Sequence, residues 1–315
     1  MNSNNIDCSI IIPIYYNEFN IEPTFEELQK EVLQQNIDKK YEVIFVDDGS
    51  GDNSLSKLLE LREKYPELIK IIKLTRNFGQ LAAMIAGYKY CRGKCAIVID
   101  ADLQDPPELI NRMLNSFFNE GFQIVIGTRA KRKESLYRRI TSRMAYSLIR
   151  KFTNVEMPDN GFNCSLLGRT ILEIILENLE ANPFFQGDIL STGYKVKHIP
   201  YLRRKREIGK SRMVFGKKIK IVLDSILAFS YLPIRIMSVT GITISFLGFI
   251  YAALIIYSRL FGGGYPFKGW APIMVLVLVL SGFQMLMLGL IGEYLWRTLD
   301  QVRNKPRYII DKIYD

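Results

Sequence analysis

Histidine and cysteine are scarce in this chain of 315 residues, which holds one histidine and four cysteines. The spacing of Cys8, Cys91, Cys95 and Cys164 matches no zinc-binding motif, which argues against a zinc site and favours a reduced, cytosol-facing protein. The solitary His198 is expected to be structural rather than catalytic. The apolar run CSIIIPIY is too short for a signal peptide and lacks a basic flank, so none is expected.

Two common phosphate-binding motifs are also missing. No G-x-G-x-x-G follows the first apolar run, and no G-x-x-x-x-G-K-[ST] occurs anywhere in the chain. Neither the dinucleotide fingerprint nor the P-loop is therefore available to hold a nucleotide. Any nucleotide must be bound by other groups.

Basic residues are concentrated in two segments. The chain is 48% hydrophobic with a net charge of +10, as expected of a folded protein. Residues 129–151 carry nine Lys or Arg and one Glu, and residues 195–220 carry eleven and one Glu. Such patches suit anionic lipid headgroups, a phosphorylated substrate or nucleic acid. The adjacent apolar segments argue against nucleic acid.

Two long runs near the C-terminus contain no charged residue. They cover residues 237–258 and 270–292, and each passes the ~20 residues that a bilayer demands. We predict a transmembrane hairpin over 233–296, preceded by an interfacial amphipathic helix at 214–232. The basic residues after the second run predict a cytoplasmic tail at 297–315 and a cytoplasmic N-terminal domain.

The N-terminal domain, residues 1–213, alternates apolar strand-like runs with helical segments. The strand-like runs are CSIIIPIY, YEVIFVD, IIKLTR and AIVID, with helices expected near 24–35, 55–65 and 79–91. Strands that are apolar throughout indicate a parallel sheet covered by helices on both faces. The fold class predicted is α/β with a mostly parallel, Rossmann-type sheet.

Acidic residues follow several of these strands, where ligands bind in such sheets. Asp100 and Asp102 lie two apart on an extended chain, so both carboxylates can face one point. A hard cation such as Mg²⁺ or Mn²⁺ would relieve their repulsion, and Gln104 can add a carbonyl oxygen. Asp105 is expected to cap the next helix. Asp47 and Asp48 either accept hydrogen bonds from a ribose or base, or form a turn.

The segments IIPIYYNE, VDDGSGDNS and residues 75–108, together with the twin apolar runs, resemble the family-2 inverting glycosyltransferases of the polyprenyl-phosphate type. The resemblance covers nearly the whole chain and implies a GT-A-like fold. It implies that the nucleotide is bound by Pro13, Tyr15, Glu18, Asp48 and Asp100. It also implies that Asp100, Asp102 and Gln104 hold Mg²⁺ or Mn²⁺.

The same resemblance assigns the basic segments to the acceptor. Arg129 and Arg143 correspond to the pair that grips the lipid phosphate. The pattern R-x-x-R-x-x-G-x-S-[KR] runs from Arg203 to Arg212 and places Arg206 and Ser211 on the acceptor phosphate. Asp159 matches the family's essential acid and, with Asp102, is expected to be catalytic. The alternative interpretation of Asp159 is a turn residue after Pro158.

The expected reaction is inverting transfer of one sugar from a nucleotide-diphosphate sugar, UDP-glucose-like, to a polyprenyl phosphate. It is expected at the cytoplasmic face of a bacterial-type inner membrane, and a homo-oligomer is left open. Departures from the family pattern at Tyr16, Asn163–Cys164 and 184–195 cluster where the sugar should bind. One alternative is a non-catalytic membrane scaffold or transporter with a nucleotide-sensing domain. Another is a polysaccharide synthase, although its Q-x-x-R-W motif is absent.

Overall fold

The computed structural model describes residues 6–102, 104–129, 158, 161–162, 164–179, 183–204, 232–261, 271–303 and 305–315. The chain divides into two compact units. One comprises Met1–Ala228 with Pro306–Asp315, and the other comprises Phe229–Lys305. The first unit holds the sheet and the second holds two long helices.

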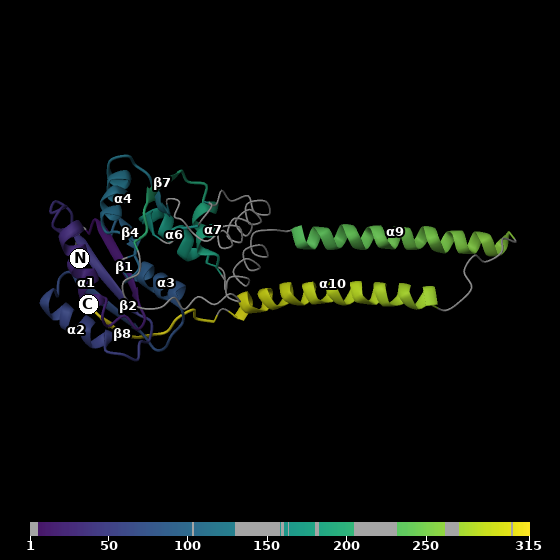
Figure 1. The fold of residues 1–315 in the computed structure, drawn as a ribbon, viewed down its shortest axis with the longest axis horizontal. Helices are drawn as coiled ribbons and strands as arrows, with labels where there is room; N and C mark the ends of the chain where they lie inside the picture. Colours follow the sequence, from purple (N-terminus) through teal and green to yellow (C-terminus); the bar gives the residue numbers. More distant parts are fainter. Residues whose placement is uncertain are drawn as a thin grey trace. The chain divides into compact units, whose positions relative to one another are not determined.

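A mixed eight-stranded sheet forms the first unit, in the order β7-β5-β6-β4-β1-β2-β3-β8 (Figure 1). Strand β1 pairs in parallel with β2 and β4, β2 with β3, and β5 with β7, whereas β6 and β8 pair antiparallel with their neighbours. The strands are β1 (Cys8–Ile14), β2 (Tyr41–Asp47), β3 (Ile69–Leu74), β4 (Cys95–Val98), β5 (Ile124–Arg129), β6 (Ser165–Gly168), β7 (Val196–Tyr201) and β8 (Ile310–Tyr314).

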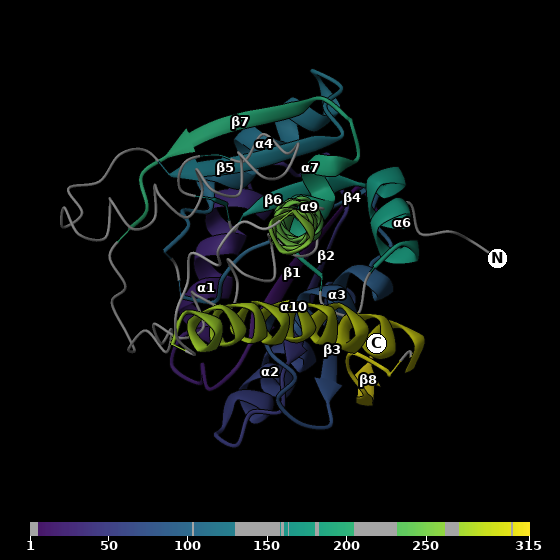
Figure 2. The same cartoon turned by 90° about the vertical axis from the view of Figure 1, so that its right-hand side faces the viewer.

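Helices cover both faces of the sheet (Figure 2). Alternation along β1 explains this arrangement, because Ile10 and Ile12 face one apolar cluster while Ile11 faces the other. The helices of the first unit are α1 (Ile21–Leu28) with its π-helical continuation η1 (Gln29–Leu33), α2 (Ser54–Lys64), α3 (Gln80–Tyr90), α4 (Glu108–Phe118), α6 (Arg169–Glu177) and α7 (Phe185–Ser191). Helices α1, α2 and α4 pack on one face, and α3, α6 and α7 on the other.

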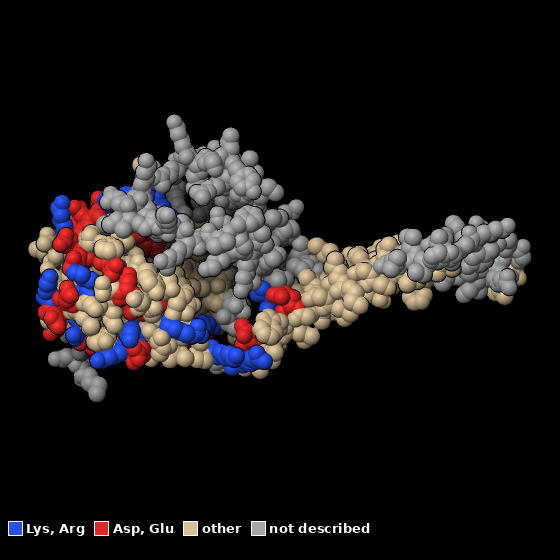
Figure 3. Space-filling model, turned by 60° about the horizontal axis from the view of Figure 1, so that its bottom comes forward, with Lys and Arg blue, Asp and Glu red and all other residues tan. Residues whose placement is uncertain are grey.

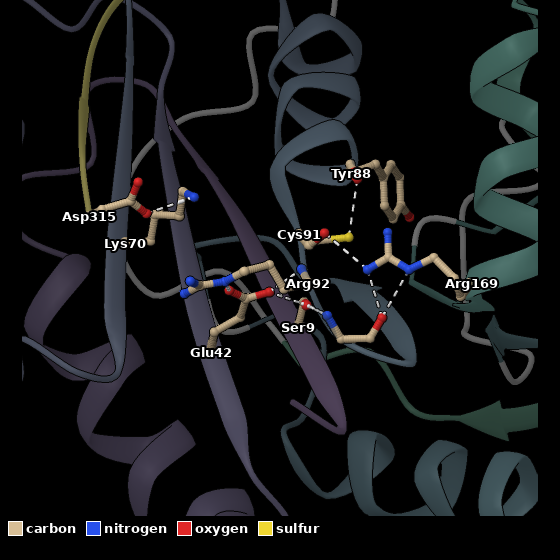
Figure 4. Close-up of polar contacts among 9 residues, drawn as sticks. Ser9, Glu42, Lys70, Tyr88, Cys91, Arg92, Arg169 and Asp315 are labelled. Carbon is tan, nitrogen blue, oxygen red and sulfur yellow. Dashed lines mark hydrogen bonds and ion pairs between the residues drawn. The ribbon is translucent and has the colours of Figure 1, made fainter. Parts of the chain in front are cut away.

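A buried polar cluster fastens the amino-terminal edge of the parallel strands (Figure 4). Glu42 at the start of β2 is 2% exposed and accepts hydrogen bonds from Ser9 Oγ, Arg92 N and Arg92 Nε. Arg169 donates to the carbonyls of Cys91 and Gly93 at 2.9 and 2.7 Å. The cluster fixes β1, β2 and the turn before β4 to one another, and each of these groups is paired.

The C-terminal residues, predicted as a cytoplasmic tail over 297–315, form parts of two elements. Helix α10 continues to Arg303, and β8 adds to the edge of the sheet beside β3. Two ion pairs hold the added strand, Lys70 to Asp315 at 2.7 Å and Lys73 to Asp311 at 2.6 Å. The end of the chain is therefore part of the sheet.

The second unit contains α9 (Leu232–Leu260) and α10 (Ala271–Arg303). Among the described residues, one helical segment, Val279–Arg303, is long and apolar enough to cross a membrane, and none of its apolar window is buried. The apolar stretch of α9, Ile236–Tyr251, is shorter. On the face drawn in Figure 3, charged side chains are spread among uncharged ones over the sheet unit, whereas the described surface of the long helices is mostly uncharged except near the end of α10. One candidate span is thus present, and the two-helix membrane hairpin stays a prediction. The predicted interfacial helix lies almost wholly outside the described residues.

Candidate active site

Six strands of the sheet end at the same edge. Strands β1 to β4 are parallel. Because β6 runs antiparallel to both β4 and β5, and β7 runs parallel to β5, strands β5 and β7 share the direction of β4. The edge therefore collects the residues that follow each strand, namely Tyr15–Glu18, Asp48, Thr75–Gly79, Asp100–Gln104, Arg129 and Leu202–Arg204. This is the edge at which ligands bind in α/β sheets.

Asp48 fixes the loop that follows β3. It is 2% exposed, and its two carboxylate oxygens accept hydrogen bonds from Phe78 N at 2.7 Å and Gly79 N at 2.9 Å. Its own amide donates to the Ile14 carbonyl at 2.9 Å. Asp48 thus joins the ends of β1 and β2 to the loop after β3. Direct contact between Asp48 and a nucleotide stays a prediction.

Burial raises the pKa of both acids at the end of β2. For Asp48, burial outweighs the two backbone hydrogen bonds that act in the opposite direction. For Asp47, burial likewise raises the pKa against the hydrogen bonds from Ser50. Asp47 Oδ1 accepts from Ser50 N at 3.0 Å, while Oδ2 is buried with no hydrogen bond from any described residue. These two buried acids therefore hold the loops at this edge through hydrogen bonds to backbone amides.

The loop after β1 is fastened to the loop after β2. Tyr16 N donates to Ser50 Oγ at 3.1 Å, and Asn53 N donates to Glu18 Oε2 at 3.0 Å. Asn53 precedes α2, so the Glu18 carboxylate lies at the positive end of that helix. The structure thus gives Glu18 a role in joining the two loops, and a contact with nucleotide stays a prediction.

Tyr16 has a strained backbone. Its φ of +55° is the one positive value at a non-glycine position among the described residues. The rings of Tyr15 and Tyr16 meet edge to face at 4.7 Å, and both are partly exposed. A Cβ on residue 51 would stand 2.7 Å from the Tyr16 hydroxyl, so Gly51 leaves room for this ring. Strain of this kind concentrates at functional sites.

Pro13, predicted to bind the nucleotide, lies within β1 opposite Val46 of β2.

The predicted metal ligands occupy the turn after β4. Asp100 Oδ1 accepts a hydrogen bond from Gln80 Nε2 at 2.7 Å. Asp102 accepts from the backbone and side-chain nitrogens of Gln104 at 3.2 and 2.9 Å. Thr24 Oγ1 of α1 donates to the Ala101 carbonyl at 3.0 Å and holds the turn. Two carboxylates and one amide carbonyl suit Mg²⁺ or Mn²⁺ chemically, although the Gln104 amide has to rotate to offer its oxygen.

No group of three or more His, Cys, Asp or Glu side chains that could hold a metal ion is present in the described part of the chain. The two aspartates and Gln104 would therefore supply only part of a coordination shell. Mg²⁺ commonly takes one or two carboxylates and completes its shell with water and substrate phosphates. The donor set fits that mode of binding.

Asp105 does not cap the following helix as we predicted. Helix α4 begins at Glu108 after Pro107, and no side chain caps it. Asp105 is buried and instead accepts a hydrogen bond of 2.6 Å from the Tyr201 hydroxyl at the end of β7. Arg203, two residues further on, reaches both Asp100 and Asp105.

Gln80 and Tyr201 are site residues that sequence reasoning missed. Gln80 follows the positive-φ Gly79, whose amide donates to Asp48. Both residues lie in the segment 75–108 that carries the family resemblance, so that segment could have indicated Gln80 as a site residue. Tyr201 and Arg203 reach the site only because β7 pairs parallel to β5. That pairing joins segments about 70 residues apart, and no local pattern reveals it.

Four of the predicted acceptor and catalytic residues lie outside the described residues, namely Arg143, Asp159, Arg206 and Ser211. The backbone of Arg129 ends β5 opposite Tyr201 of β7, at the edge that carries the acids. Strand β6 starts at Ser165, opposite Val98, so the chain that precedes it enters at the same edge. The roles of these four residues and of Arg129 stay predictions.

A doubly covered α/β sheet whose carboxyl edge collects acidic loops is the architecture of GT-A glycosyltransferases. The chain belongs to the family described as glycosyl transferase family 2, whose sequence profile matches residues 9–176. The match begins within β1 and ends within α6.

Individual relatives agree with this assignment. The uncharacterized glycosyltransferase YkcC of Bacillus subtilis is 37% identical over 313 residues, 99% of this chain and 95% of that protein. An undecaprenyl-phosphate 4-deoxy-4-formamido-L-arabinose transferase of Photorhabdus laumondii is 34% identical over 306 residues, 97% of this chain and 93% of that protein. Glucosyl-3-phosphoglycerate synthase of Mycobacterium tuberculosis, solved with Mg²⁺ and UDP, has a TM-score of 0.50 at 18% identity over 71% of this chain and 79% of that one. At that identity the likeness shows the fold alone.

Proposed function

We propose that this family 2 glycosyltransferase transfers one sugar from a nucleotide-diphosphate sugar to a polyprenyl phosphate, with inversion at the anomeric carbon. The observation that carries the proposal is the 34% identity to an undecaprenyl-phosphate sugar transferase over 97% of this chain. That match extends beyond the sheet unit into the apolar C-terminal helices. A shared lipid acceptor would explain why both chains carry such helices.

The second unit supports the proposed membrane location. Val279–Arg303 is a candidate span with no buried residues in its apolar window, so a bilayer is the environment that would cover it. We propose that α9 forms the second half of a hairpin. The catalytic unit and both termini then lie on the cytoplasmic side of a bacterial inner membrane, where nucleotide sugars are made.

The proposed chemistry is a single displacement. An oxygen of the lipid phosphate attacks the anomeric carbon, that carbon's bond to the diphosphate oxygen breaks, and the nucleoside diphosphate leaves with the electron pair. Asp100, Asp102 and Gln104 would hold Mg²⁺ or Mn²⁺, which neutralises charge on the leaving diphosphate. The phosphate nucleophile is already anionic, so the remaining task for the protein is placement.

We assign the placement of substrates to residues from several loops. Pro13, Tyr15, Glu18 and Asp48 shape the nucleotide side, where hydrogen bonds join the loops after β1, β2 and β3. On the acceptor side we propose Arg129, Arg143, Arg206 and Ser211 for the lipid phosphate and Asp159 for orienting the acceptor or sugar. A UDP-glucose-like donor is our choice to test first.

The test uses the full chain in detergent with a radiolabelled UDP, GDP or CDP sugar and undecaprenyl phosphate. We expect organic-soluble product only with Mg²⁺ or Mn²⁺. Asp102→Asn should lower turnover by about a hundredfold or more, because it removes charge from the proposed metal site. Asp38→Asn, at an exposed position, is the matched control and should leave turnover unchanged.

Two results would count against the proposal. Full activity of Asp102→Asn would remove the metal assignment while leaving the transfer reaction intact. Absence of lipid-linked product with all three nucleotide classes, from a chain that still binds nucleotide, would remove the transfer reaction itself.

A further inference from the structure

The segment after β7 is attached to the turn that carries the proposed metal ligands. The Tyr201 hydroxyl donates to Asp105 Oδ1 at 2.6 Å, and Arg204 N donates to the Gln104 carbonyl at 2.9 Å. These contacts hold the backbone on both sides of residue 203 against the turn. The side chain of Arg203 is thereby directed at the acids.

Arg203 lies between two carboxylates. Its Nη2 is 3.4 Å from Asp100 Oδ2, and its Nε is 3.6 Å from Asp105 Oδ1. The Asp105 side chain is only 2% exposed. Its other oxygen, Oδ2, is buried and receives no hydrogen bond from any residue that the structure describes. A buried carboxylate needs a nearby positive charge, and Arg203 supplies it.

Both oxygens of Asp100 are engaged in this arrangement. Gln80 Nε2 donates to Oδ1 at 2.7 Å, and Arg203 holds Oδ2. A divalent cation held by Oδ2 would share this oxygen with the guanidinium, and two positive charges at one carboxylate oxygen repel each other in a partly buried site. The guanidinium and the metal would therefore compete for this oxygen.

We propose that Arg203 is a positioning residue that competes with the metal ion for Asp100. It neutralises Asp100 before metal binds and is displaced when the metal arrives. Asp105 keeps the guanidinium close by, so the displacement breaks one of its two ion pairs and is readily reversed. The inference rests on the proposed function, since it requires a metal at Asp100. It adds that the Arg203 guanidinium occupies the Asp100 carboxylate when no metal is bound.

The experiment measures Mn²⁺ binding rather than turnover. The full chain in detergent is titrated with Mn²⁺ without donor, and free Mn²⁺ is followed by electron paramagnetic resonance. Arg203→Gln should bind Mn²⁺ about fivefold more tightly than the wild type, the change expected from losing one partly buried ion pair. Arg204→Gln is the matched control and should bind as the wild type does, because that guanidinium pairs with Glu27 and Glu108 instead.

Arg203→Lys keeps the charge without the planar fork and should bind Mn²⁺ with an intermediate affinity; it also serves if Arg203→Gln fails to fold, as judged from thermal unfolding. Equal affinity in Arg203→Gln and wild type, or weaker binding in Arg203→Gln, would overturn the competition. No Mn²⁺ binding by the wild type or any variant at millimolar metal would instead overturn the metal assignment in the proposed function, and this inference with it.

Discussion

Gly49 packs against the backbone of Arg76 so closely that a Cβ on residue 49 would stand 2.5 Å from the Arg76 carbonyl carbon. This contact brings the end of β2 against the loop that Asp48 holds. Gly49 also has a φ of +67°. We expect Gly49→Ala to destabilise the sheet unit by about 2 kcal/mol or more and to weaken nucleotide binding, because the loop has to move.

Gly121→Ala separates the cost of the positive φ from the cost of the close approach to Arg76. Gly121 has a φ of +77°, but a Cβ there meets no atom within 4 Å. It should cost only the backbone penalty of about 1 kcal/mol and leave nucleotide affinity unchanged. The measurements are urea unfolding and titration with UDP, using the full chain. Equal losses in the two variants would show that the approach to Arg76 has no consequence.

The buried acids of β2 make stability depend on pH. Burial raises the pKa of Asp47 above its ordinary value of 3.8. A raised carboxyl pKa stabilises the fold fully below pH 3.8, and this contribution is lost as pH rises through the native pKa. Asp47→Asn removes the ionisation, so its stability relative to the wild type should increase as pH rises above 3.8.

The measurement for Asp47→Asn is the unfolding free energy of both chains from pH 3.5 to 6.5. Asparagine can still accept the hydrogen bond from Ser50 N through its carbonyl oxygen. Asp38→Asn, at an exposed surface position, is the control for the substitution itself. A flat difference between Asp47→Asn and wild type across this range would contradict the assignment.

The polar cluster at the opposite edge should affect stability without affecting the site. Glu42 accepts three hydrogen bonds, and Glu42→Gln replaces an acceptor oxygen with an amide that faces donors. We expect a loss of about 2–3 kcal/mol in unfolding free energy. UDP affinity below the unfolding transition should stay the same. Glu63→Gln, on the exposed face of α2, is the control for both measurements.

Local patterns predicted much of the fold, because β1 to β4 are apolar runs bounded by acids and glycines. The edge that gathers those acids followed from parallel pairing alone. The partners of the acids did not follow. Asp48 binds backbone amides 30 and 31 residues away, and Asp105 and Asp100 meet Tyr201 and Arg203 through the pairing of β7. Such contacts depend on which strands become neighbours, which hydrophobic periodicity does not encode.

Strand β8 ties the segment after α10 to the loops of the candidate site. It pairs with β3, and Thr75 N donates to the Ile309 carbonyl at 3.0 Å, just before the loop that Asp48 holds. Deleting residues 309–315 would expose the β3 edge and remove the carbonyl that accepts the hydrogen bond from Thr75 N. We expect weaker UDP binding, by about threefold to tenfold, and a greater tendency to aggregate.

A double variant, Asp311→Asn with Asp315→Asn, distinguishes the backbone ladder from the charges. It removes both ion pairs but keeps every backbone hydrogen bond of β8. The carboxylates are 46% exposed at Asp311 and 66% exposed at Asp315, and pairs with exposed partners contribute little, so UDP affinity should fall less than twofold. If the double variant loses as much affinity as the deletion, the charges rather than the strand hold the loop. If neither variant changes UDP affinity, β8 does not act on UDP binding. The hydrogen bonds to Asp48 would then be sufficient to hold the loop at Thr75–Gly79.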